Sequence, residues 1–353
     1  MRCWAALTAR PSAVGMGDIG MARSFRTAPV VGLTLFLAAA SGGDEHLIAL
    51  RHRVWQIGLQ GQIAPFPYEF PGCCDETLSG STAPSPSPDG RWIAFGRDFN
   101  IHLLNVSSRQ EHQITWFGQQ PRRGYTYAEV LIGAWSSDSR QIVLVVAPGE
   151  TATEWGELLV PDAPYGFYVY NCATGTAQPV ALPKTFQLKA WLPDGRFLGV
   201  IPGRRPYEGD KLVMFRPGDA EGAAIRAPTG SPTHVQVSAD GEWLIGLLAG
   251  DAGQRGTTQI VKINLATMSV TPLVSLSSWT GNERPALSPR GEHISYLHTT
   301  GMVKGIPQQT LIVDQRPLYA CHAPIDYRWV GGRTIAVACQ DQVLLLDAVA
   351  GPP

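Results

Sequence analysis

The side chains best suited to binding in this chain are arginines, tyrosines and tryptophans in the long segments between its apolar runs. Arginine offers a planar fork of donors for anions, and aromatic rings supply large contact areas at protein interfaces. We therefore predict that these segments form a binding surface. The candidate binding residues are Trp116, Arg122, Arg123, Tyr125, Tyr127, Trp155, Arg204, Arg205, Tyr207, Arg255 and Trp279.

Four carboxylates lie in the same segments and are the candidates for acid–base catalysis: Glu154, Glu157, Glu208 and Asp210. Their spacing does not reveal the carboxylate pair that glycoside hydrolysis uses. The sequence also lacks the G-x-S-x-G elbow that carries the nucleophilic serine of α/β-hydrolases. We therefore assign no catalytic residue and expect a protein that is not an enzyme, with an enzyme kept as the alternative.

Histidines and cysteines show no spacing typical of metal ligands, so neither a metal nor another cofactor is predicted. His102 alternates with apolar neighbours and is interpreted as a packed side chain. Cys321 and Cys339 fall in adjacent repeats and could form a disulfide. The pairing of Cys73, Cys74 and Cys172 stays open.

A recurring sequence phrase predicts the elements that would position these side chains. The phrase consists of an apolar strand, a tight turn and a second strand that opens with a charged residue. Its clearest copy is Ser87-Pro88-Asp89-Gly90, where proline, aspartate and glycine each suit one position of a tight turn. A period of about 40–50 residues with several strands per unit is typical of a β-propeller. The equivalent positions are Asp89, Asp138, Asp194, Asp240, Arg290 and Gly331.

The repeats predict an all-β propeller of four-stranded antiparallel blades. After the apolar run 343–346 the last repeat lacks material for a fourth strand, whereas residues 46–66 contain three short apolar runs. One of these runs is expected to complete the last blade, which gives six blades and leaves no open edge. If residues 46–66 form most of a blade of their own, the count becomes seven.

Composition and the N-terminal segment indicate the compartment. The 353 residues carry a formal net charge of −1, which does not favour a nucleic-acid partner. Residues 21–40 have the basic start, apolar run and small residues of a signal peptide, and residues 1–20 are interpreted as a mis-assigned upstream extension. Residues 41–353 are expected to form a single propeller domain. The protein should be exported to the periplasm or outside the cell, without a stable membrane span once the leader is cleaved; a retained anchor is the alternative.

The phrase Ser87-Pro-Asp-Gly-Arg-Trp-Ile-Ala-Phe95, followed by the run 100–106, resembles the WD-like propeller repeat of TolB and of the dipeptidyl peptidase IV N-terminal domain. This resemblance covers residues 79–347 and implies the fold. It implies no peptidase activity, because the hydrolase half of that family has no counterpart in the sequence.

The order of strands in a blade places its short hairpin turns on one side of the ring and its long connections on the other. The candidate binding residues all fall on the long-connection side, so we predict a non-catalytic propeller that binds a protein or peptide there. Two alternatives stay open. One is an enzyme of the lyase, glycosidase or lactonase type with its site in the central funnel, and the other is an accessory subunit of a separately encoded hydrolase.

Overall fold

The structure is a computed structural model of the whole chain. It describes residues 45–50, 53–58, 61–70, 83–118, 128–148, 163–183, 185–202, 211–217, 223–225, 233–249, 258–276, 283–340 and 342–350. By their contacts the residues fall into two units, Met1–Val30 and Val31–Pro353, and every described residue belongs to the second. The expected signal peptide (21–40) and upstream extension (1–20) therefore lie outside the described residues.

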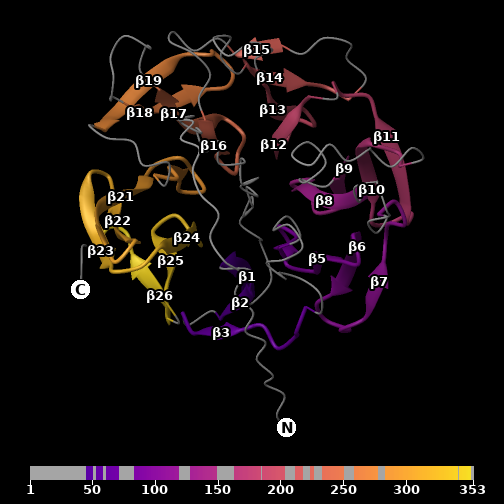
Figure 1. Ribbon diagram of the computed structural model, residues 1–353, viewed down its shortest axis with the longest axis horizontal. Coiled ribbons are helices and arrows are strands. Elements are labelled where there is room, and N and C mark those ends of the chain that lie inside the picture. Colours follow the sequence, from indigo (N-terminus) through magenta and orange to yellow (C-terminus); the bar gives the residue numbers. More distant parts are fainter. Residues whose placement is uncertain are drawn as a thin grey trace, which may run out of the picture. The chain divides into compact units, whose positions relative to one another are not determined.

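The described residues form seven antiparallel sheets that follow one another around a ring (Figure 1). Blade 1 has β1 (Glu45–Leu50), β2 (Arg53–Gly58) and β3 (Ile63–Pro65). Blade 2 has β4 (Ser85–Pro86), β5 (Trp92–Arg97), β6 (Asn100–Asn105) and β7 (Glu111–Gln113). Blade 3 has β8 (Ala128–Trp135), β9 (Gln141–Pro148), β10 (Gly166–Asn171) and β11 (Thr176–Val180).

The remaining blades continue the same order. Blade 4 has β12 (Gln187–Trp191), β13 (Phe197–Ile201), β14 (Lys211–Phe215) and β15 (Ala223–Ile225). Blade 5 has β16 (Thr233–Val237), β17 (Trp243–Ala249), β18 (Thr258–Asn264) and β19 (Val270–Leu276). Blade 6 has β20 (Ala286–Leu287), β21 (Ile294–Val303), β22 (Ile306–Val313) and β23 (Arg316–Cys321). Blade 7 has β24 (Ile325–Trp329), β25 (Thr334–Cys339) and β26 (Gln342–Asp347).

Blades 1 and 7 each have three strands among the described residues, where four were predicted. The preferred count of six blades closed by an N-terminal strand is wrong and the alternative of seven is confirmed, because β1–β3 pair with one another and form a blade of their own. The cause is a tight turn: the Gly58 N–H donates to the Gln62 carbonyl, and Gly61 adopts a φ of 77°. Such a turn makes local pairing easier than a reach to a distant strand. Blades 1 and 7 instead meet through apolar side chains, with Ile48 and Leu50 facing Ala336.

The repeated turns are held together by their own side chains. Ser87 Oγ donates to Asp89 Oδ1 at 2.7 Å, and the same carboxylate oxygen accepts the Arg91 N–H at 3.0 Å. The Trp92 N–H in turn donates to Ser87 Oγ at 3.0 Å. These bonds satisfy the backbone of the turn, so its aspartate is structural. The pattern recurs at Ser136 with Asp138 and at Ser238 with Asp240.

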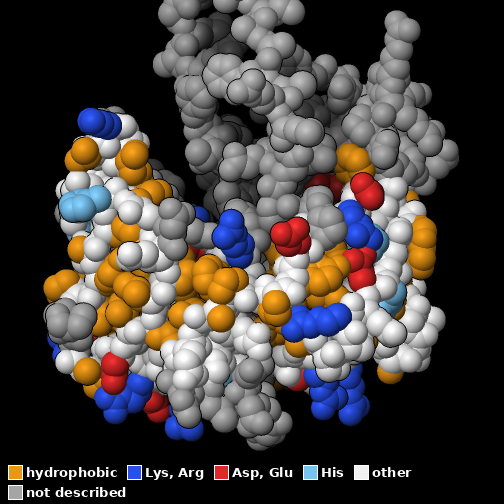
Figure 2. All heavy atoms as spheres, turned by 90° about the horizontal axis from the view of Figure 1, so that it is seen from below, with side chains coloured by type: hydrophobic (Ala, Val, Ile, Leu, Met, Phe, Trp, Pro, Cys, Tyr) orange, Lys and Arg blue, Asp and Glu red, His pale blue; other side chains and the backbone are white. Residues whose placement is uncertain are grey.

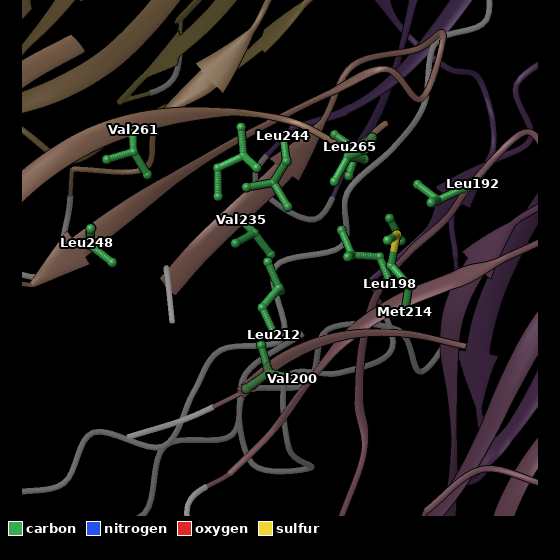
Figure 3. Close-up of a cluster of buried hydrophobic side chains, with 13 residues drawn as sticks. Leu192, Leu198, Val200, Leu212, Met214, Val235, Leu244, Leu248, Val261 and Leu265 are labelled. Atoms are coloured by element: carbon green, nitrogen blue, oxygen red, sulfur yellow. The ribbon is translucent and has the colours of Figure 1, made fainter. Parts of the chain in front are cut away.

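The core consists of apolar layers between neighbouring blades. Figure 3 shows one such layer between blades 4 and 5, where Leu198 and Leu212 approach Leu244 and Val235. The tryptophans that precede the repeat turns, Trp135, Trp191 and Trp329, are also buried. A disulfide joins Cys321 at the end of β23 to Cys339 at the end of β25, as the sequence had suggested.

Candidate site in the central channel

Neighbouring repeat turns touch one another, which places them on one side of the ring. The Asp89 N–H of blade 2 donates to Ser139 Oγ of blade 3 at 2.9 Å, and the Ala239 N–H of blade 5 donates to the Pro289 carbonyl of blade 6 at 3.1 Å. We call this side the turn face. The opposite side, where each innermost strand begins and each second strand ends, is the loop face.

Of the predicted binding residues the structure describes only Trp116, which follows β7 on the loop face and is 74% exposed. The other predicted residues lie outside the described residues, so they stay predictions: Arg122, Arg123, Tyr125, Tyr127, Trp155, Arg204, Arg205, Tyr207, Arg255 and Trp279. The same holds for the candidate carboxylates Glu154, Glu157, Glu208 and Asp210.

A group of charged side chains that sequence reasoning missed comes together on the innermost strands, which lie closest to the centre of the ring (Figure 1). The charges of Lys189, Glu283 and Arg284 all act on the His234 ring, so four residues from blades 4, 5 and 6 share one neighbourhood. Blade 7 joins them through an ion pair of 3.9 Å between Arg284 Nη1 and Asp326 Oδ1. We call the group the channel site: Lys189, His234, Glu283, Arg284, Asp326 and Arg328.

Irregular backbone directs two of these side chains. The pairing of β12 with β13 shifts register between Leu188 and Ala190, and that of β16 with β17 shifts between Thr233 and Gln236. Lys189 and His234 therefore sit at bulges, which turn a side chain away from the regular alternation of a strand.

His234 and Arg284 also adopt left-handed backbone, with φ of 49° and 30°. Such values are uncommon for residues other than glycine and concentrate at functional sites. Arg284 is held in this conformation by the buried Tyr327, whose hydroxyl donates to the Arg284 carbonyl at 2.5 Å. Burial raises the pKa of Tyr327, so the phenol keeps the proton for this bond.

Of the acids of the channel site, Glu283 is buried and Asp326 is half-buried, whereas the cations reach solvent. Glu283 is 2% exposed and the Asp326 side chain 16%, but the side chains of Arg284 and Arg328 are 50% and 34% exposed. A ligand that enters the channel therefore meets guanidinium groups first, with the carboxylates behind them. This arrangement favours an anion over a cation.

The guanidinium group of Arg328 is oriented so that it could bind an anion. Its Nη1 donates to Asp326 Oδ1 at 2.9 Å and to the Tyr327 carbonyl at 2.7 Å. Among the described residues no hydrogen-bond partner reaches its Nε or Nη2. Two parallel N–H groups of this kind match the two oxygens of a carboxylate.

A pocket of mixed polarity lies next to Arg328, in the part of the channel toward the turn face. Its walls come from blades 1, 5, 6 and 7 and include Ile48, Val237, Leu287 and Trp329. Gln236 also lines it and accepts the Leu287 N–H at 3.0 Å. A small pocket that combines aliphatic side chains with one guanidinium suits a ligand that has an aliphatic part beside an anionic group.

His234 is the titratable group of the channel site that lies closest to neutral pH. Desolvation of the ring, followed by the positive charges of Lys189 and Arg284, lowers the pKa of His234, and the charge of Glu283 opposes this shift. The ring is therefore neutral at pH 7 and can donate from one nitrogen and accept at the other. Within the described residues no three histidine, cysteine, aspartate or glutamate side chains group as metal ligands would.

A second polar cluster lies at the interface of blades 1 and 2 and is fully paired. Glu111 accepts a bond from the Tyr68 hydroxyl at 2.5 Å, forms an ion pair with Arg97 and lies 2.9 Å from His102 Nδ1. Burial opposes the charge of Glu111, but the bond from Tyr68 and the charge of Arg97 outweigh it and lower its pKa. His102 is packed as predicted, stacked on Phe95. The cluster fastens the segment after β3 to blade 2.

Comparison of the sequence with protein-family models and with curated proteins found no match. Solved structures do match. Oligogalacturonate lyase from Vibrio parahaemolyticus aligns over 86% of each chain with a TM-score of 0.58 and 12% identity. TolB from Acinetobacter baumannii, at 13% identity and a TM-score of 0.47, aligns with 77% of this chain but covers only 62% of its own. Dipeptidyl peptidase 4 from Porphyromonas gingivalis aligns with 83% of this chain over 46% of its own length, at 15% identity and a TM-score of 0.46.

The chain shares its β-propeller fold with the lyase. The matching structures include TolB and dipeptidyl peptidase 4, whose repeats the Ser-Pro-Asp-Gly phrase resembles. Identities of this size say nothing about ligands. In the described part of the chain no helix is long and apolar enough to cross a bilayer.

Proposed function

We propose that the protein is an exported, non-catalytic β-propeller that binds a protein or peptide partner through its loop face, and that a carboxylate of the partner enters the channel site. The observation that carries the proposal is the layering of charge, with the more exposed Arg284 and Arg328 in front of the buried Glu283 and the half-buried Asp326. Asp326 pairs with both guanidinium groups, and their other N–H groups would bind the ligand.

The neighbouring pocket supports a peptide rather than a free inorganic anion. Val237, Leu287 and Trp329 provide apolar surface next to Arg328. An aliphatic side chain of the peptide would occupy the pocket while the neighbouring carboxylate binds Arg328. Export remains an inference from residues 21–40 and belongs to the same proposal.

The test uses random peptides with a free C-terminal carboxylate, and the same peptides amidated, against the immobilised protein. We expect the carboxylate forms to bind and the double variant Arg284→Gln with Arg328→Gln to bind about tenfold or more weakly, because charged hydrogen bonds contribute about 1.5–3 kcal/mol. The matched control is Arg91→Gln with Arg140→Gln, two exposed arginines of the turn face that also lie beside aspartates. Equal losses in both variants would contradict the proposal.

One observation favours an enzyme of the lyase type as the second candidate. A neutral His234 could accept a proton while Arg284 or Arg328 binds the substrate carboxylate, as elimination next to a carboxylate requires. Incubation with oligogalacturonate, followed by ultraviolet absorbance of the unsaturated product, tests this candidate. Product formation that His234→Asn abolishes would replace the binding proposal with the catalytic one.

A further inference from the structure

The hairpin of β21 and β22 extends beyond the rest of its blade. β20 pairs with β21 only at Ser295 and Ile294, and β23 pairs with β22 only from Gln309 onward. Residues 299–308 therefore form a two-stranded ribbon on the loop face, which we call the hairpin tip. On the left of Figure 2, the side where β21 and β22 lie in Figure 1, a projection carries hydrophobic side chains beneath a basic one.

The hairpin tip is built to hold its shape. Val303 pairs with Ile306 across a two-residue turn, and Lys304 and Gly305 in that turn have φ of 51° and 80°. Two positive φ values mark the type I′ turn, whose twist matches that of the strands it joins. The tip therefore presents its side chains without the cost of ordering a flexible loop.

Both faces of the hairpin tip are apolar. Val303 and Ile306 form one cross-strand pair, and Met302 and Pro307 form the next pair, which projects from the opposite face. Met302 is 63% exposed, Val303 51% and Ile306 48%. A flat protein surface would cover only one of these two faces, whereas the fluid boundary region of a lipid bilayer would surround both.

The edge of the hairpin tip does not favour addition of a partner strand. In the pair after the turn, Met302 with Pro307, the backbone groups point away from the hairpin. Pro307 has no N–H to offer there, and proline at an edge is a common device against strand pairing.

The charge of the hairpin tip is positive. Lys304 is exposed at the turn itself, and the tip contains no aspartate or glutamate. Arg284 of the same blade is a further exposed cation on the loop face. Anionic lipid headgroups attract exposed lysine and arginine, and apolar side chains enter the boundary between headgroups and acyl chains.

We propose that the protein docks peripherally on anionic lipid bilayers through the hairpin tip, with Met302, Val303 and Ile306 entering the interface and Lys304 contacting lipid phosphates. The proposal concerns a surface outside the channel site and does not depend on the ligand bound there. It places the loop-face end of the channel site, at Arg284, toward the membrane.

The experiment is co-sedimentation of the full chain with vesicles of phosphatidylglycerol and phosphatidylcholine in equal parts, and with vesicles of phosphatidylcholine alone. We expect sedimentation with the mixed vesicles and at least about tenfold weaker partitioning for the triple variant Met302→Ser, Val303→Thr, Ile306→Thr. Lys304→Glu should weaken partitioning several-fold. Circular dichroism confirms that each variant is folded, and threonine and serine at an exposed tip leave the core untouched.

The matched control is Val349→Thr, which changes an exposed hydrophobic side chain that follows β26 on the turn face. This variant should partition as the wild type does.

Wild-type protein that stays in the supernatant with mixed vesicles, or a triple variant that sediments unchanged, would overturn the proposal. So would light scattering that shows a wild-type dimer which the triple variant converts to a monomer, because the tip would then bind a second copy. Carboxylate peptides binding equally to the triple variant would leave the channel proposal intact.

Discussion

The turn face and the loop face use the same kinds of side chain for different purposes. On the turn face blades 2, 3 and 5 repeat one solution, in which an aspartate accepts bonds from a serine and from a backbone N–H of the same turn, as at Ser87 and Asp89. On the loop face each blade contributes something different, such as Lys189 at a bulge or Arg284 in left-handed backbone.

This difference indicates how charge relates to function in a repeat protein. A charged side chain whose hydrogen bonds are made within its own turn stabilises the fold, however often the turn recurs. Arg284 and Asp326 instead come from different blades, and their 3.9 Å contact exists only when the ring is assembled. Residues brought together in this way are the better candidates for binding.

The largest expected effect is a loss of stability from a substitution in the apolar layer between blades 4 and 5, which supports both faces. Leu198 is fully buried between blades 4 and 5 (Figure 3). Leu198→Ala should lower the free energy of unfolding by about 2–5 kcal/mol, because it removes apolar contact and leaves a cavity. Chemical denaturation measures the change. Unaltered stability would show that the blades do not depend on this layer.

A smaller effect is expected from a single turn on the turn face. Ser238 is buried and joins Asp240 to the Trp243 N–H. Ser238→Ala should cost about 1–2 kcal/mol of stability, since it leaves those groups without their partner, and should not change peptide binding. The exposed Ser269 of the same blade provides the control variant Ser269→Ala. A loss of binding in Ser238→Ala at unchanged stability would remove the distinction between the faces.

The smallest effect is a dependence of stability on pH that arises at the channel site and at the blade 1–2 interface. Burial is the first cause of a lowered pKa for both His234 and His102 in the folded protein. The unfolded chain then binds more protons below about pH 6.5, so stability is full above that pH and falls as the pH drops through the lowered values. Melting temperatures at pH 7.5 and pH 5.5 measure the decline. His234→Asn should reduce its slope, and a variant with the full slope would exclude His234 as a source.

The sequence predicted the repeats and their turns because both depend on local chemistry, as in Ser87-Pro88-Asp89-Gly90. It misjudged the number of blades because the connection between β1 and β2 lacks that phrase, so their run could equally have supplied one closing strand. The channel site was missed for another reason. Lys189 and Arg328 alternate with apolar residues as in any half-buried strand, and only the assembled ring with its bulges reveals that they converge.

The most direct test of the channel site is a thermodynamic cycle on one binding peptide, measured by titration calorimetry. The peptide is used with its free carboxylate and as its amide, against the wild type and against Arg328→Gln. If Arg328 binds the carboxylate, amidation should weaken wild-type binding about tenfold and leave the variant nearly unaffected, a coupling of about 1.4 kcal/mol. Equal weakening of wild type and variant, with no coupling, would contradict the account.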